Sequence, residues 1–238
     1  MPSDLKLRAP STSGLASLEQ WAYTQIKEAI ISLALPPGAP LVEAHLAEQL
    51  GLSKTPLRAA LLRLEREGFV IGIPYKGSSV APISLEVLAQ LRQLRIATEG
   101  HAIYSAALSF GSGDIAAVEA LLAAQEQAEA VGDLAEAARL EDGFDDLFLE
   151  RLGNPRFVEI AAELRDHRRR LRFAMEGLNP GLSSFRASHR AILDAVRRRD
   201  ACGAYQTFID IMTAYGTFVE RMAREGKMRH VGVEPEVG

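Results

Sequence analysis

The sequence has few of the features that mark secreted, membrane-spanning or disulfide-linked proteins. Its 238 residues include one cysteine, Cys202, so no disulfide can form within the chain, and a single thiol fits the reducing cytosol. No apolar run approaches the 18 residues that a membrane-spanning helix needs. No basic segment followed by an apolar one opens the chain. We therefore expect a cytoplasmic protein that is neither secreted nor embedded in a membrane.

A large excess of either charge is also missing, because the formal net charge is only −4. That value argues against indiscriminate coating of nucleic acid. Residues 51–80 differ from the rest, since they hold five basic residues against two acidic ones: Lys54, Arg58, Arg63, Arg66 and Lys76 against Glu65 and Glu67. This local surplus can face phosphates or form an ordinary solvated helix face, and charge alone does not separate the two interpretations.

Two short amphipathic helices joined by a tight turn are predicted between residues 43 and 66. In residues 43–50 leucine and alanine recur at helical spacing, and Gly51 follows where a left-handed residue would end the helix. Thr55 is the predicted cap of the second helix. Pro56 suits its first position, because an N–H there would have no acceptor within the helix.

The second of these helices presents two different faces. Leu57, Leu61 and Leu64 form one apolar stripe, which leaves Lys54 and Arg58 to project elsewhere from the helix start. This is the geometry of a helix-turn-helix, whose second helix enters the DNA major groove by its N-terminal end. We therefore favour a DNA-binding function for this segment.

A basic-tipped wing is predicted directly after the second helix. Residues 69–80 have the pattern of two short strands around Tyr75, Lys76 and Gly77. Such a hairpin would place its basic tip beside the recognition helix.

The order of these residues resembles the winged helix of the GntR family of bacterial transcription regulators. The matching positions are Pro37-Gly38, Leu41, Leu46-Ala47, Gly51, Ser53-Lys54-Thr55-Pro56, Arg58, Ala60-Leu61, Arg63-Leu64, Glu67-Gly68 and Gly77. Three positions depart from the pattern: Lys54 replaces arginine, Ala59 replaces glutamate, and Leu33 replaces the glycine that usually ends the first helix. Because lysine lacks the bidentate fork that arginine offers guanine, the resemblance supports phosphate binding at this position more than base recognition.

The resemblance also implies roles for individual residues. Ser53 and Thr55 would hold phosphate, and Lys54 and Arg58 would reach bases or nearby phosphates. The pair Lys76-Gly77 would touch the adjoining minor groove or the backbone.

The whole chain is expected to be mainly α-helical, with an N-terminal winged helix-turn-helix followed by an all-α bundle. We divide it into a disordered arm (1–17), a winged domain (18–82) whose first helix covers 18–33, a helical domain (83–230) and a tail (231–238). The helical domain shows no strand pattern. Its predicted helices cover 84–109, 114–131, 133–152, 155–178, 183–199 and 201–225, with Asp114, Asp133, Pro155, Ser183 and Asp200 as start signals.

The helical half resembles the FCD effector-binding and dimerisation domain of the FadR-like branch of the GntR family, in its six-helix, VanR-like version. The motif residues are Arg95, Thr98-Glu99, Gly153-Asn154-Pro155, His189, Ile192, Ala195 and Asp200. Members of this family commonly bind small carboxylates, often through a divalent metal held by one aspartate and three histidines. The resemblance thus implies a small anionic effector.

The metal ligands of that family match this chain incompletely. Counting from the Gly153-Asn154 turn, the family's aspartate, phenylalanine and histidine fall on Glu141, Phe144 and Asp145. Another alignment places them on Asp145, Phe148 and Leu149, and the last family histidine falls on Ile211. Either way, a four-ligand zinc or nickel site lacks ligands.

Four residues remain candidates for an effector site: Arg95, Glu141, Asp145 and His189. The last three have two interpretations. In one, they hold a divalent metal weakly. In the other, His189 is a hydrogen-bonded core residue, and the two carboxylates are either solvated or paired with arginines. Arg95 would clamp an effector carboxylate, or pair with Glu99 in a purely structural contact. His167, which is flanked by leucines at helical spacing, is also expected to face the bundle interior.

We interpret the chain as a ligand-responsive transcription regulator, most simply a repressor, that binds a palindromic DNA operator as a homodimer. A dimer is expected because one winged helix contacts too few phosphates for tight binding. The apolar side of the last helix either belongs to the core or forms the seam between two subunits. Two alternatives stay open. One is an all-α metalloenzyme that uses Glu141, Asp145 and His189, and the other is a regulator whose effector pocket has decayed.

Overall fold

The computed structural model describes residues 15–73, 77–175 and 182–232, which fall into two compact units. The winged unit contains the described residues up to Ser84, together with residues 166–175 and 227–232. The helical unit contains residues 85–165 and the described residues from 182 to 226. Residues 83–84, 166–175 and 227–230, which the sequence placed in the helical domain, therefore cluster with the winged unit.

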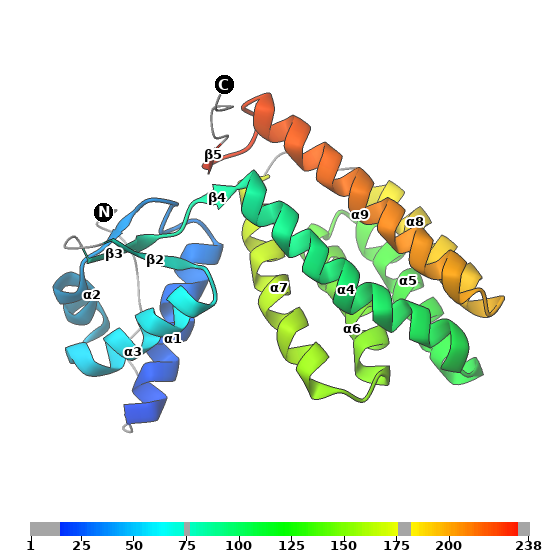
Figure 1. Ribbon diagram of the computed structural model, residues 1–238, viewed down its shortest axis with the longest axis horizontal. Helices are drawn as coiled ribbons and strands as arrows, with labels where there is room; N and C mark the ends of the chain where they lie inside the picture. The colour runs from blue at the N-terminus through cyan, green and yellow to red at the C-terminus, as the bar shows by residue number, and fades with distance from the viewer. Residues whose placement is uncertain (1–14, 74–76, 176–181, 233–238) are drawn as a thin grey trace. The chain divides into compact units, whose positions relative to one another are not determined.

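The N-terminal part of the winged unit is built from three helices and a small antiparallel sheet (Figure 1). Its elements are α1 (Leu15–Ile31), β1 (Pro40–Leu41), α2 (Glu43–Leu50), α3 (Lys54–Arg66), β2 (Val70–Ile73) and β3 (Gly77–Val80). The strands are ordered β1-β3-β2, and Val70 pairs with Val80 at the base of the β2–β3 hairpin. The predicted hairpin is therefore confirmed, while Tyr75 and Lys76 lie outside the described residues.

The predicted ends of these helices are partly confirmed. Gly51 ends α2 in the left-handed conformation, with φ +64°, as predicted. Thr55 was the wrong cap: Ser53 is extended and precedes the helix, so Thr55 lies in its first turn. Helix α1 starts at Leu15, three residues before the predicted Leu18, so the last residues of the predicted arm are helical.

The core of the winged unit packs the apolar faces of its helices against the sheet. Leu57, Leu61 and Leu64 of α3 are buried, which confirms the predicted leucine stripe. They contact a cluster that includes Ile26 and Ile30 of α1. Burying one such side chain stabilises the fold by about 1.5–3 kcal/mol, so this stripe fixes how α3 lies on the unit.

A charged cluster joins α1 to the C-terminal part of α7 (Pro155–Ala174) inside the winged unit. The buried Lys27 ammonium lies 2.8 Å from a Glu67 carboxylate oxygen, 2.5 Å from one of Asp166, and 2.7 Å from the Tyr23 hydroxyl. Burial alone would lower the pKa of Lys27, but its bonds to Asp166, Glu67 and Tyr23 raise it. Lys27 therefore stays charged and holds two carboxylates from distant segments.

His167 does not face the bundle interior, so that prediction was wrong. Its ring stacks on Phe69 of the winged unit, with ring centroids 4.1 Å apart, and Nε2 donates a hydrogen bond to the Glu67 carbonyl oxygen at 2.8 Å. Burial lowers the pKa of His167, although this hydrogen bond acts in the opposite direction. Spacing showed that His167 lies on an apolar face, but not which partner covers that face.

Two further contacts tie distant segments into the winged unit. The buried guanidinium of Arg170 donates to the Ala81 carbonyl oxygen at 2.6 Å, and burial lowers its pKa to about 10. Strands β4 (Ile83–Ser84) and β5 (Val231–Gly232) pair in parallel. These short strands were not predicted, because two residues carry no alternating pattern.

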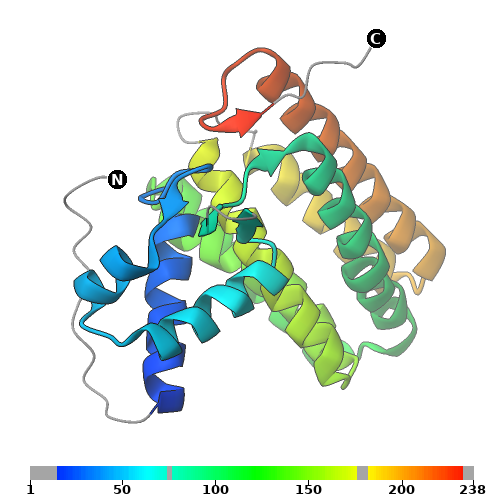
Figure 2. The same ribbon diagram turned by 60° about the vertical axis from the view of Figure 1, so that its left-hand side comes forward.

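The helical unit is an antiparallel arrangement in which α4 lies beside α9 in both views (Figures 1 and 2). Its helices are α4 (Leu85–Ser109), α5 (Ser112–Ala130), α6 (Leu134–Arg151), the N-terminal part of α7, α8 (Leu182–Arg197) and α9 (Ala201–Arg224). The six predicted helices occur in the predicted order in the described residues. The mainly α fold class is confirmed with them.

The starts of these helices follow mostly from short polar side chains. Asp133 and Asp200 accept hydrogen bonds from backbone N–H groups at 3.0 and 2.8 Å and cap α6 and α9 as predicted. Asp114 lies inside the first turn of α5 and accepts a bond from the Gly111 N–H at 2.9 Å. Ser183 was the wrong start signal, because α8 already begins at Leu182.

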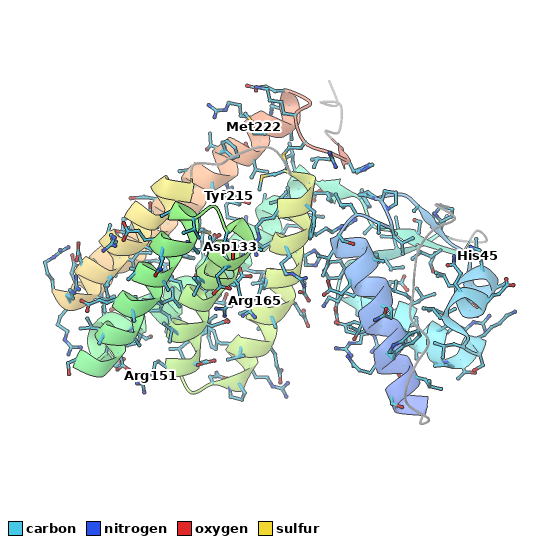
Figure 3. The ribbon with its side chains drawn as sticks, turned by 180° about the vertical axis from the view of Figure 1, so that it is seen from behind. His45, Asp133, Arg151, Arg165, Tyr215 and Met222 are labelled. Atoms are coloured by element: carbon cyan, nitrogen blue, oxygen red, sulfur yellow. The ribbon has the colours of Figure 1, made fainter. Side chains whose placement is uncertain are left out.

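The last helix contributes mainly to the core. Phe208, Ile211, Met212, Val219 and Met222 are buried along α9, and Figure 3 labels Met222 with the partly buried Tyr215. Phe144 and Phe148 of α6 belong to the same unit's core. Within the described residues, no helix is long and apolar enough to cross a bilayer.

We predict that Leu33→Gly stabilises the winged unit. Leu33 has φ +61°, a left-handed conformation that costs an ordinary L-residue roughly 1–2 kcal/mol. Glycine removes that strain but adds freedom to the unfolded chain, so we expect a net gain of about 0.5–1 kcal/mol in the free energy of unfolding.

Urea denaturation of the purified protein measures this gain. Ser32→Gly, one residue earlier and without positive φ, is the matched control and should not stabilise. Equal effects of the two substitutions would contradict the argument from strain.

Candidate functional site

The N-terminal end of α3 is an exposed, basic tip. Ser53, Lys54, Thr55 and Arg58 are all exposed, while the leucine stripe on the other side of the helix is buried. Gly77 is also exposed and begins β3 with φ +88°, a conformation that favours glycine. Lys76, the other predicted wing contact, lies outside the described residues.

Arg58 is held at one side of its guanidinium by an acidic residue of α2. Its Nε lies 2.8 Å from a Glu43 carboxylate oxygen, and both side chains are open to solvent. This bond uses Nε, and the guanidinium carries two further nitrogens that can donate hydrogen bonds. Such an exposed pair contributes little stability, about 0–1 kcal/mol, but it restricts the orientation of the fork.

Nothing in the sequence indicated that Glu43 belongs to the site. Its position in the first turn of α2 shows no relation to Arg58, which lies fifteen residues later. Only the turn at Gly51 brings the two helices together. His45, on the same short helix, is also exposed (Figure 3).

The helical unit contains a buried cluster of one cation and two carboxylates. Arg95 of α4 bonds Glu99 one turn later at 2.8 Å and reaches Asp145 of α6 at 3.4 Å. The side chains of these three residues are only 5–12% exposed. The predicted Arg95–Glu99 contact is therefore present, and Asp145 adds a longer, weaker one.

His189 lies in the interior of the same unit, as its spacing predicted. Its ring stacks on Phe144 of α6, with centroids 4.0 Å apart and ring planes 9° from parallel. It is 8% exposed, whereas Glu141 is only partly buried. The shared core position of Phe144 and His189 explains why α6 and α8 meet at this point.

The three-residue metal site is not formed in this structure. Among the described residues, which include Glu141, Asp145 and His189, no three His, Cys, Asp or Glu side chains are grouped to hold a metal ion. Asp145 bonds Arg95 instead, and His189 stacks on an aromatic ring. Spacing along the chain had suggested a cluster that the packing of α4, α6 and α8 does not assemble.

An open hollow of about 350 Å³ lies on the helical unit and was not anticipated from the sequence. It is lined by Ala97, His101 and Tyr104 of α4 and by Tyr205 of α9. The three α4 residues recur at spacings of four and three, which is the signal that could have revealed a common face. These residues differ from those of the Arg95 cluster.

Two protein families match successive parts of the chain. The family described as "Bacterial regulatory proteins, gntR family" matches residues 18–80, and the family described as "FCD domain" matches residues 90–214. The HTH-type transcriptional regulator McbR of Escherichia coli (strain K12) is 28% identical over 198 residues, which cover 82% of this chain and 90% of McbR. The Nta operon transcriptional regulator of Aminobacter aminovorans is 31% identical over 178 residues, covering 74% and 82%.

A solved structure agrees with these sequence matches. The structure of E. coli McbR/YncC aligns with a TM-score of 0.67 and 26% identity, over 87% of this chain and 98% of that one. A winged helix-turn-helix with an exposed basic tip, joined to a helical effector-type domain, defines a DNA-binding transcription regulator rather than an enzyme. The chain belongs to the GntR family, in the FadR-like branch that carries an FCD domain. The metalloenzyme alternative is not favoured.

We predict that Arg95→Met destabilises the helical unit by about 3 kcal/mol, because it leaves two buried carboxylates without this cation. Arg139→Met is the matched control. Arg139 also bonds a carboxylate, that of Glu136 at 2.6 Å, but on the open surface of α6.

Guanidinium denaturation of both variants measures the difference. The control should unfold at nearly the wild-type midpoint. If Arg95→Met did so too, the Arg95 cluster would not stabilise the unit.

Proposed function

We propose that this regulator is a repressor that binds a palindromic operator as a homodimer in the cytoplasm and responds to a small anionic effector in its helical unit. One observation supports it most: Lys54 and Arg58 are exposed at the start of α3, whose opposite face is anchored by buried leucines. Rigid placement of basic groups is what readout of a DNA groove requires.

In this proposal the start of α3 enters the major groove. Arg58 uses its terminal nitrogens for guanine or phosphate, while Glu43 holds Nε. Lys54 supplies a point charge for phosphate, and Ser53 and Thr55 donate hydroxyl hydrogen bonds. Lys76 and Gly77 contact the adjoining minor groove or backbone. A second copy doubles these contacts, which gives the affinity that one winged helix lacks.

We predict that Arg58→Ala weakens operator binding about 10- to 100-fold, in line with the loss of roughly 1–3 kcal/mol for one good contact. The protein should keep its wild-type unfolding midpoint, because Arg58 is exposed. Glu43→Gln should behave differently: it removes an acidic group but keeps Arg58, so binding to random-sequence DNA rises while discrimination falls.

Fluorescence anisotropy at several salt concentrations tests both variants. The probes are a random duplex and the fragment protected in a footprint on the gene's own promoter. Arg139→Ala, exposed on the helical unit, is the control and should bind like wild type. Wild-type affinity of Arg58→Ala at fixed salt would rule out the proposed DNA contact.

The effector site is proposed to be the Arg95 cluster. A ligand carboxylate would compete with Asp145 for Arg95, since the 3.4 Å contact with Asp145 is longer and weaker than the 2.8 Å bond to Glu99. Glu99, one helical turn after Arg95, would keep the guanidinium in place through its own bond. Exchange of Asp145 for a ligand would shift α6 relative to α4 and so change the populations of the regulator's conformations.

We predict that a small carboxylate raises the melting temperature of the wild-type protein and that Asp145→Asn binds it more tightly. The asparagine removes both the competitor and a negative charge beside Arg95. A panel of acetate, lactate, succinate and citrate serves as the probe, since a ligand that binds only the folded state stabilises it by about 2.7 kcal/mol at 100 times Kd.

Calorimetric titration gives Kd independently of the melting temperature. Arg95→Gln should abolish carboxylate binding, and Arg139→Gln should leave it unchanged. If Asp145→Asn and wild type bound every carboxylate equally, Arg95 would be a structural residue only. If neither protein bound any carboxylate, the alternative of a decayed pocket would hold.

A further inference from the structure

Helix α7 is shared by the two units. Its residues up to Arg165 belong to the helical unit, and its residues from Asp166 onward belong to the winged unit. The helix runs without interruption through this boundary. Neighbouring residues of an α-helix point about 100° apart and share one hydrogen-bonded backbone, so neither moves far without the other. A displacement of Arg165 is therefore passed on to Asp166.

Arg165, which is labelled in Figure 3, attaches α7 to α6 within the helical unit. Its guanidinium bonds the carboxylate of Asp146, the residue that directly follows Asp145 of the Arg95 cluster. Burial raises the pKa of Asp146, Arg165 lowers it, and the charge of Asp145 raises it. The two neighbouring carboxylates of α6 therefore influence each other, although Asp145 bonds α4 and Asp146 bonds α7.

Asp166 attaches α7 to the winged unit through Lys27 of α1. The Lys27 ammonium bonds Asp166 at 2.5 Å and Glu67 at 2.8 Å, and Glu67 is the residue at which α3 ends. His167 contacts the same residue directly, because its Nε2 donates to the Glu67 carbonyl oxygen at 2.8 Å. Two successive residues of α7 thus hold the end of the proposed DNA-binding helix.

Further bonds connect α7, α1 and α3 within the winged unit. Arg169 of α7 uses both terminal nitrogens to bond the Glu28 carboxylate of α1, each at 3.0 Å. Arg63 of α3 bonds Glu67 at 3.1 Å, and its guanidinium lies 3.6 Å from the centre of the Tyr23 ring of α1. These contacts make the three helices one connected network around Glu67.

The two attachments of α7 differ in strength. The side chains of Lys27 and Glu67 are each only 9% exposed, and a buried charge that loses its partner is costly. The Arg165 and Asp146 side chains are 29% and 33% exposed, so their bond contributes less. A change in the helical unit therefore alters the Arg165 bond first, while the Lys27 bonds keep α7 attached to α1 and to the end of α3.

We infer that α7 couples the helical unit to operator binding: the Asp146–Arg165 bond links it to α6, and the Asp166–Lys27–Glu67 bonds link it to the end of α3. This inference rests on the proposed function and specifies how the Arg95 cluster acts on α3. A ligand carboxylate that displaces Asp145 moves its neighbour Asp146, and α7 carries this movement to Glu67. Arg165 and Lys27 are then positioning residues that do not touch DNA.

Hydrogen exchange of the full chain, measured by mass spectrometry without DNA, tests the coupling itself. Arg165→Gln removes a bond in the helical unit, yet amide exchange at the end of α3 should become roughly threefold faster or more, because Glu67 is held less firmly. Arg156→Gln is the matched control. Arg156 lies on the same helix and bonds Glu159 within it at 2.7 Å, so its loss should leave α3 unchanged.

Two outcomes of the exchange measurement would overturn the coupling. One is wild-type exchange at the end of α3 in Arg165→Gln. The other is equal acceleration in α5 and α3, which would show a general loss of stability and no transmission along α7.

A charge reversal tests whether the Asp146–Arg165 bond is the link. Arg165→Asp alone should accelerate exchange at α3, and adding Asp146→Arg restores an ion pair of opposite polarity. The double variant should return to within about twofold of wild type, since coupled residues show non-additive effects. A double variant that exchanges as fast as Arg165→Asp would overturn the role of this bond.

Operator affinity, measured by anisotropy with the footprinted promoter fragment, separates this inference from the proposed function. Arg165→Gln and Asp166→Asn should each weaken binding about three- to tenfold, whereas Arg156→Gln should bind like wild type. Both variants interrupt one route, so their combination should be no weaker than the weaker single variant. A combined loss equal to the product of the two would overturn the route. A wild-type chain that binds no operator DNA would overturn the proposed function, while the exchange data still decide whether α7 couples the units.

Discussion

The packing of the α3 leucines against α1 is the contact on which the DNA-binding surface depends. Leu57, Leu61 and Leu64 turn one side of a thirteen-residue helix into the core, so its other side, which begins with Lys54, faces solvent. Lys54 and Arg58 are therefore positioned by apolar contacts they do not make themselves. Glu43 then limits how the Arg58 fork can turn.

Both units also use a buried cation that gathers two carboxylates. Lys27 bonds Glu67 and Asp166 in the winged unit, and Arg95 bonds Glu99 and Asp145 in the helical unit. In the winged unit both carboxylates come from segments far along the chain, and in the helical unit one of them does. Such clusters are sensitive to the loss of a partner, because an uncompensated buried charge costs several kcal/mol. The same sensitivity makes the Arg95 cluster suited to respond to an added carboxylate.

Helix α4 carries part of the proposed effector site. Its buried side presents Arg95 and Glu99 to the interior, while Leu94 and Leu108 on its other side are exposed. A ligand that moves Arg95 would therefore act on a helix that packs against both α6 and α9.

The sequence by itself determined the elements: the helix-turn-helix, the hairpin, six further helices, and the inward side of α3 and α9 all follow from spacing, capping residues and glycine. Leu33 was already recognisable as an irregular helix end, and its positive φ explains why glycine is usual there. Only the tertiary structure decided which faces meet. Periodicity identifies an apolar side but not what covers it, so His167 proved to stack on Phe69, Asp145 to bond Arg95 and not a metal, and α4 to keep a second apolar side exposed. These outcomes depend on contacts between residues 50 to 100 positions apart, which no local pattern encodes.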